Sequence, residues 1–226
     1  MKKKNLLVGL LLVVLINLTA CGNNIANEDS IKFKEEYESL NGKIGNNEKI
    51  YRSITINENN PIVYINAEEL IKKMDNEENF YVYFGSEYCP WCRSVIEKAI
   101  SIADEKKIDK IYYVDIWDDE GNEILRDKYI IGSDNKLKQT IKGTNEYYEL
   151  LKRFDNLLTN YTLEDKEGNQ VDVGVKRIFA PSFIYINKGK AIKLVSGISN
   201  KQNDSREDLT KEMLEDETII FNEFFK

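Results

Sequence analysis

Residues 80–93 read FYVYFGSEYCPWCR and form the most informative stretch of the chain. The first five residues are aromatic or β-branched, which predicts a buried strand, and a turn follows them. Pro90 suits the first turn of a helix, and apolar residues recur at helical spacing over residues 95–103. Cys89 and Cys92 therefore fall at a junction between a strand and a helix.

This position predicts a reactive cysteine pair. At a helix N-terminus, the helix dipole and free N–H groups stabilise a thiolate, so we expect a lowered pKa for Cys89. Cys92 lies one turn further along and can attack a sulfur bonded to Cys89. The loop between the two cysteines is too short for a disulfide that would stabilise the fold. Zinc would need more thiolate or imidazole ligands, so we expect no metal and no cofactor.

The composition excludes several classes of function. The chain has 226 residues, a formal net charge of −7 and no histidine. Without histidine there is no Ser/His or Cys/His catalytic pair and no histidine-ligated metal. The net negative charge and the lack of glycine-rich phosphate-binding motifs argue against nucleic acid or nucleotides as partners.

The N-terminal sequence predicts that the protein is exported from the cytoplasm. In residues 1–20, three lysines precede a mostly apolar run of 13 residues. As a helix this run would reach about 20 Å, short of the roughly 30 Å of a membrane core. Residues 18–21, Leu-Thr-Ala-Cys, resemble the lipobox of bacterial lipoproteins, which implies lipidation of Cys21 and an anchor on the extracytoplasmic face of the cell membrane. The alternative is a plain signal peptide with a chance cysteine.

Two segments together resemble the thioredoxin superfamily. Residues 84–93 look like its active-site segment, and residues 178–190, IFAPSFIYINKGK, look like its cis-proline loop and the following hairpin. Pro181 would be the cis-proline; alternatively it is trans and merely begins a strand. The resemblance implies an α/β, thioredoxin-like fold. It also implies catalytic roles for Cys89 and Cys92 and a client-binding surface made by Pro90, Trp91, Ala180 and Pro181. Trp91 could instead simply cover the start of the helix.

Patterning elsewhere fits this fold. We expect strands at 62–65 and 111–116, a helix over 67–74 with an Asn66–Glu69 capping box, and a C-terminal helix capped by Ser205 or Asp208.

The domain organisation follows from these elements. Residues 21–45 read as the lipidated cysteine and a flexible stalk that could hold one short helix, and residues 46–226 as the domain. An apolar stripe between Tyr147 and Tyr161 predicts that residues 118–177 form an inserted helical subdomain between the third strand and the cis-proline loop. This insertion would cap the active site, or its stripe would simply pack on the sheet.

The chain differs from thioredoxins at a position that serves proton transfer. Thioredoxins have a buried aspartate where this chain has Tyr83, so another group must deprotonate Cys92. Glu87 is a candidate proton shuttle; its alternative is a solvated acid in an exposed turn.

The resemblance implies a membrane-anchored thiol-disulfide oxidoreductase acting on extracytoplasmic proteins, with a membrane redox partner and an undetermined direction of electron flow. As a whole, the chain resembles three kinds of protein. These are lipoprotein oxidoreductases, bacteriocin transport accessory proteins of Gram-positive bacteria, and cytochrome c maturation factors. The alternative is a non-catalytic binding lipoprotein that assists a secretion or transport complex.

Overall fold

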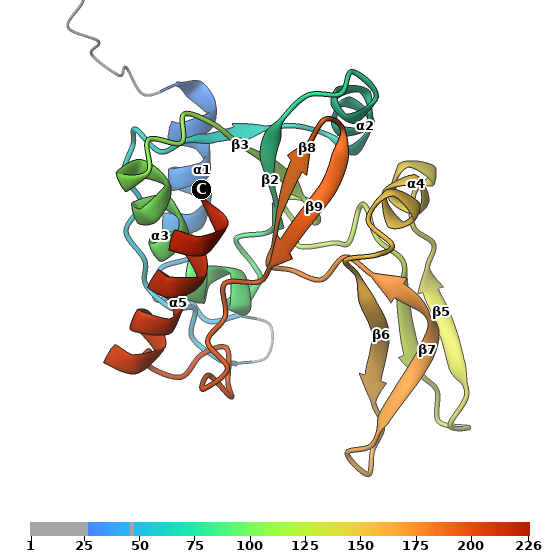
Figure 1. Ribbon diagram of the computed structural model, residues 1–226. Coiled ribbons are helices and arrows are strands. Elements are labelled where there is room, and N and C mark those ends of the chain that lie inside the picture. Colours follow the sequence, from blue (N-terminus) through green and yellow to red (C-terminus); the bar gives the residue numbers. More distant parts are fainter. Residues whose placement is uncertain (1–26, 46–47) are drawn as a thin grey trace, which may run out of the picture.

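The computed structural model describes residues 27–45 and 48–226, which form a mixed α/β protein with five helices (Figure 1). The predicted signal sequence (1–20) and Cys21 lie outside the described residues. Within the described ranges, no helix has the length and apolar character needed to span a membrane.

A five-stranded mixed sheet lies at the centre, in the order β1-β3-β2-β8-β9. The strands β1 (Ile62–Tyr64), β3 (Ile111–Asp115) and β2 (Phe80–Gly85) run parallel. The strands β8 (Ser182–Asn187) and β9 (Lys190–Val195) form a hairpin, with β8 antiparallel to β2. The strands and the hairpin predicted from the sequence are confirmed.

Helices cover both faces of this sheet (Figure 1). The helices α1 (Glu28–Ser39), α3 (Pro90–Glu105) and α5 (Lys211–Phe224) contribute to one core. The helices α2 (Ala67–Asp75) and α4 (Asn145–Arg153) contribute to a second core on the other face. Because β2 is buried on both faces, its residues are apolar or aromatic throughout rather than alternating with polar ones.

Helix α1 corrects the predicted domain boundary. The sequence predicts that residues 21–45 are the lipidated cysteine and a flexible stalk with room for one short helix. A helix is present, but it is not part of a stalk, because Phe33 and Tyr37 are fully buried in the first core. The Phe33 ring lies 5.0 Å from that of Tyr113 in an edge contact, and Asn60 Nδ2 donates to the Ser30 carbonyl at 2.8 Å. The many polar residues of this segment form the solvent face of an amphipathic helix, so the domain includes α1.

The prediction of a helical insertion at 118–177 is wrong. The insertion contains one helix, α4, and two hairpins, the first made by β4 (Lys128–Ile131) and β5 (Leu137–Ile141) and the second by β6 (Thr159–Glu164) and β7 (Gln170–Arg177). Both hairpins extend away from the central sheet (Figure 1).

The apolar stripe is helical only in its first part. Tyr147, Leu150 and Phe154 are fully buried in the second core, which confirms the alternative that the stripe packs on the sheet. Past α4, the β-branched and aromatic residues Thr159 and Tyr161 favour a strand.

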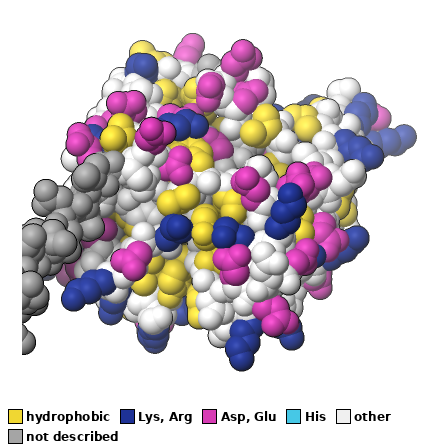
Figure 2. Space-filling view, turned by 90° about the horizontal axis from the view of Figure 1, so that it is seen from above, with side chains coloured by type: hydrophobic (Ala, Val, Ile, Leu, Met, Phe, Trp, Pro, Cys, Tyr) yellow, Lys and Arg dark blue, Asp and Glu magenta, His cyan; other side chains and the backbone are white. Residues whose placement is uncertain are grey.

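Charges of both signs are interspersed on the face that Figure 2 shows, with hydrophobic side chains between them.

Helix α5 is capped by Thr210, whose hydroxyl accepts a hydrogen bond from the Met213 N–H at 3.3 Å. The predicted caps Ser205 and Asp208 lie before the helix, in a loop. This correction is small because Thr210 is itself a good capping residue two positions further on.

Glu217 of α5 gives the first prediction. Its carboxylate is fully buried and makes no hydrogen bond, and burial raises its pKa to about 7. The unfolded chain ionises this group at a lower pH, so the folded state loses stability as the pH rises through this window. We expect Glu217→Met to raise the free energy of unfolding by about 1–3 kcal/mol at about pH 8 and to reduce its pH dependence. Urea denaturation at several pH values measures both effects; an unchanged pH slope would contradict the prediction.

Candidate active site

Cys89 is the N-cap residue of α3. Its sulfur accepts a hydrogen bond from the Cys92 backbone N–H at 3.2 Å, as expected for a thiolate site at a helix N-terminus. Cys89 is 7% exposed and Cys92 is fully buried, and both are free thiols. The predicted junction between strand and helix is confirmed: β2 ends at Gly85 and α3 begins at Pro90.

The two thiols have opposite pKa shifts. Burial alone would raise the pKa of Cys89, but hydrogen bonds from the Cys92 thiol and N–H and the positive charge of Arg126 outweigh it and lower the pKa. Burial and the neighbouring Cys89 raise the pKa of Cys92 well above its ordinary value. Cys89 is therefore the thiol suited to attack, and Cys92 retains its proton at neutral pH.

The segment around Pro181 lies next to Cys89 in the structure. The Ala180–Pro181 peptide bond is cis, which confirms this prediction, and the Cys89 thiol donates a hydrogen bond to the Ala180 carbonyl at 3.5 Å. Trp91 is half-buried and packs against the first core. The structure thus brings together Pro90, Trp91, Ala180 and Pro181 around Cys89.

Phe179 lies in the same segment and was not predicted as a site residue. It is 40% exposed, and its ring contacts that of Tyr161 on β6 at 6.1 Å in an edge arrangement. The sequence signal that could have indicated it is an aromatic residue immediately before the Ala-Pro pair. The contact links the surface beside the cysteines to the inserted hairpins.

Tyr83 occupies the position discussed above for proton transfer. It is fully buried in the first core together with Cys92, and its hydroxyl is hydrogen-bonded to that of Tyr37 at 2.8 Å. Burial raises the pKa of Tyr83 well above its ordinary value, so the phenol is neutral. A neutral hydroxyl can both donate and accept a proton.

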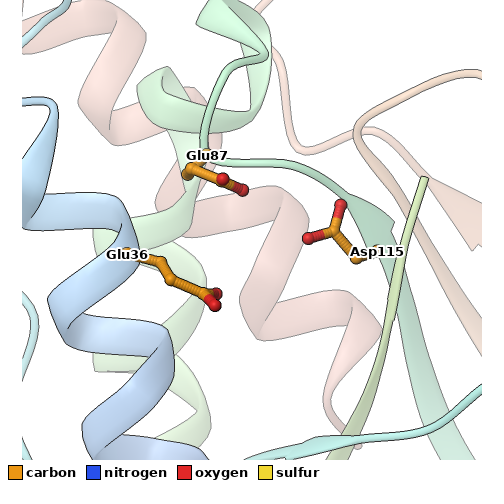
Figure 3. A group of neighbouring side chains, drawn as sticks. All are labelled: Glu36, Glu87 and Asp115. Carbon is orange, nitrogen blue, oxygen red and sulfur yellow. The ribbon is translucent and has the colours of Figure 1, made fainter. Parts of the chain in front are cut away.

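Glu87 is buried, so the alternative of a solvated acid in an exposed turn is wrong. It is 6% exposed, and the Ser86 hydroxyl donates to its carboxylate at 3.1 Å. Glu87, Glu36 of α1 and Asp115 of β3 place one carboxylate oxygen each within 4.8 Å of one another (Figure 3). Burial raises the pKa of Glu87, and burial raises that of Asp115 to about 7. Mutual repulsion among the acids adds to both shifts.

This carboxylate cluster offers oxygen ligands of the kind that Mg²⁺ or Ca²⁺ accepts. Three carboxylates alone do not make a metal site. The expectation of no metal and no cofactor stays a prediction.

A buried ion-pair network was not predicted. Arg126 contacts Glu123 at 2.7 Å, Arg177 contacts the same carboxylate at 3.5 Å, and Arg177 also pairs with Asp127 at 3.3 Å. Arg126 further donates to the Ile178 carbonyl at 3.1 Å. All four side chains are at most 7% exposed. The network fixes the insertion to the segment that leads to Pro181 and places a positive charge near Cys89. The sequence does not predict it, because Arg177 is far from Glu123 and Asp127 in the chain and forms no local pattern with them.

No family model matches the chain, and no curated protein matches its sequence. What the fold and the site define is a class: a mixed α/β protein with a Cys-x-x-Cys pair at a helix N-terminus, facing a cis-proline.

Proposed function

We propose that the chain is a thioredoxin-like thiol-disulfide oxidoreductase that acts on extracytoplasmic proteins. The observation that carries the proposal is the position of Cys89. Its thiol has a lowered pKa, caps a helix, and lies 3.5 Å from the carbonyl that precedes the cis-proline. A reactive thiol beside the backbone carbonyl that precedes a cis-proline suits the capture of an extended client segment.

The exchange proceeds in two steps. The Cys89 thiolate attacks one sulfur of a client disulfide, forming a mixed disulfide and releasing the other client sulfur as a thiolate, which takes a proton from water. The Cys92 thiolate then attacks the Cys89 sulfur, which releases the second client thiolate and leaves a Cys89–Cys92 disulfide. The client gains two electrons and the pair loses two; the reverse sequence oxidises a client.

The client surface surrounds Cys89. An extended segment would pair with the backbone at Ala180 and cover the exposed part of Phe179 and the half-buried Trp91. Aromatic side chains of this kind supply contact area to many different sequences, which suits an enzyme with several protein clients.

Residues 1–21 support the proposed location. Their resemblance to a lipoprotein signal supports an anchor through Cys21 on the extracytoplasmic face of the cell membrane. There it would exchange electrons with a membrane redox partner, whose potential sets the direction of transfer.

The test is catalysed disulfide exchange. With insulin and dithiothreitol, the purified protein is expected to accelerate insulin reduction above the rate given by the Cys89→Ser/Cys92→Ala double variant. Equal rates would overturn the proposal and favour the alternative of a non-catalytic binding lipoprotein that serves a secretion or transport complex.

A further inference from the structure

One edge of the central sheet holds both the cysteines and the cis-proline. The parallel strands β1, β3 and β2 end at this edge, and β8, which is antiparallel to β2, begins there. Cys89 follows β2 and Pro181 directly precedes β8. Because β2 lies between β3 and β8, the segments that follow β1 and β3 lie on the other side of the cysteine segment from Pro181.

Two adjoining pockets open beside the ends of β1 and β3. Their volumes are about 540 Å³ and 490 Å³, and Tyr64, Asp115 and Ile124 line both of them. We call the two together the β1–β3 groove. Ile124 is 51% exposed where the two pockets meet, so a bound chain would bury it. The other apolar residues of the groove are Ile65, Ala67, Val114, Trp117 and Leu125.

The charges of the groove are nearly all negative. Its acidic residues are Glu36, Glu68, Glu69, Asp115, Asp118, Asp119, Glu120 and Glu146. Among the described residues that line it, Lys32 is the only basic one, and it already pairs with Glu36 at 3.4 Å. No salt bridge within the described chain involves Asp115, Asp119 or Glu146. These acids therefore leave a negative field that a basic ligand would complement.

Crowding of the acids also favours a cationic occupant. Glu36, Glu87 and Asp115 place carboxylate oxygens within 4.8 Å of one another (Figure 3). Burial raises the pKa of Asp115 to about 7, and repulsion by Glu87 and Glu36 adds to this shift. A positive charge in the groove would offset the repulsion.

Tyr88 joins the groove to the active site. It directly precedes Cys89, its ring lies 6.4 Å from that of Trp117, and its hydroxyl donates a hydrogen bond to the Asp119 carbonyl. Trp117 and Asp119 both line the groove. A chain bound at Cys89 can therefore continue over Tyr88 into the groove.

The strand spacing indicates which client residue would reach the groove. Neighbouring strands lie about 4.8 Å apart, so β1 is about 10 Å from β2, and an extended chain advances about 3.3 Å per residue. A client residue about three positions from the cysteine that reacts with Cys89 would then lie over the groove.

We propose that the β1–β3 groove binds a basic segment of the client, with lysine or arginine about three residues from the client cysteine. The positive group pairs with the acids of the groove, and the aliphatic part of the same side chain packs on Ile124. This inference rests on the proposed exchange function and adds a substrate class to it: extracytoplasmic proteins whose reactive cysteine is flanked by basic residues.

The test compares peptides in the first step of exchange. Each peptide carries one cysteine as a mixed disulfide with thionitrobenzoate, and lysine, glutamine or glutamate stands three residues to either side of it. The Cys89 thiolate of the reduced protein attacks the peptide sulfur, forms a disulfide with the peptide and releases coloured thionitrobenzoate. We expect the lysine peptide to react about tenfold faster than the glutamine peptide at low salt and the glutamate peptide to react slowest. High salt should reduce these differences, because ions screen the charges.

A double variant locates the effect. Asp119→Asn/Glu146→Gln removes two charges of the groove and is expected to lower the rate ratio of the lysine to the glutamine peptide to about threefold or less. Glu105→Gln/Asp109→Asn is the matched control. It removes the same net charge from exposed positions between the end of α3 and the start of β3, at the opposite edge of the sheet. This control should keep the wild-type ratio.

The outcomes separate the groove from the exchange function. Equal rates for the three peptides, or the same lysine preference in the groove variant and the control, would overturn the groove proposal while exchange itself stands. Calorimetric titration with calcium chloride is run alongside; binding of Ca²⁺ together with equal peptide rates would assign the groove to a metal cation instead. If no peptide reacts faster with the wild type than with Cys89→Ser/Cys92→Ala, the proposed function fails and the groove proposal fails with it.

Circular dichroism checks that each variant folds. Should the double variant of the groove not fold, Asp119→Asn alone is expected to lower the preference for the lysine peptide, because the side chain of Asp119 is exposed and its backbone carbonyl still accepts the Tyr88 hydroxyl.

Discussion

Replacing Cys89 with serine is expected to reduce disulfide exchange by about a thousandfold or more, to the rate of the uncatalysed reaction. The reason is that a serine hydroxyl does not ionise near neutral pH, so the helix N-terminus and Arg126 have no anion to stabilise.

Replacing Cys92 with alanine leaves the first attack intact but removes the resolving thiol. The mixed disulfide with the client should then accumulate, which non-reducing electrophoresis and mass spectrometry of the protein detect.

The control for both substitutions is Ser101→Ala, an exposed position on the same helix, for which wild-type exchange is expected. Two results would contradict this prediction. One is substantial exchange by Cys89→Ser, which would mean that Cys92 or another group is the nucleophile. The other is full turnover by Cys92→Ala without a trapped intermediate, which would mean that the second cysteine has no role in resolution.

The site is predictable from sequence to the extent that its determinants are local. The strand before the cysteines, the helix that begins at Pro90 and the hairpin after Pro181 each depend on a few consecutive residues with a clear period or turn signal. Position at a helix N-terminus then implies the lowered pKa of Cys89, since the dipole and the N–H groups come with the helix.

The errors arise where tertiary contacts decide. Helix α1 is rich in charged residues, and only its burial against β1 and β3 distinguishes it from a stalk. Strand β7 carries valines at alternate positions, 171, 173 and 175, and this period of two is typical of a strand, whereas the helical period ends with α4. Glu87 looked like a solvated turn residue because nothing near it in sequence announces Glu36 or Asp115, which close over it from α1 and β3.

The ion-pair network shares this property. It joins residues that are far apart in the chain, and it gives Cys89 a nearby positive charge that the segment of the cysteines lacks. The local motif therefore predicts the type of chemistry, whereas the reactivity of each thiol depends on the assembled core.

Removing Arg126 is expected to be the most destabilising of the substitutions considered. Arg126→Ala leaves the buried carboxylate of Glu123 without its closest partner and frees the Ile178 carbonyl, which should lower the free energy of unfolding by about 3–5 kcal/mol. Because Arg126 also lowers the pKa of Cys89, that pKa should rise in the variant, which pH-dependent alkylation measures. Arg153→Ala is the control: its pairs with Asp75 and Glu149 lie at the surface, so its loss should cost about 0–1 kcal/mol. Equal urea midpoints for the two variants would show that the buried network does not fix the insertion to the Pro181 segment.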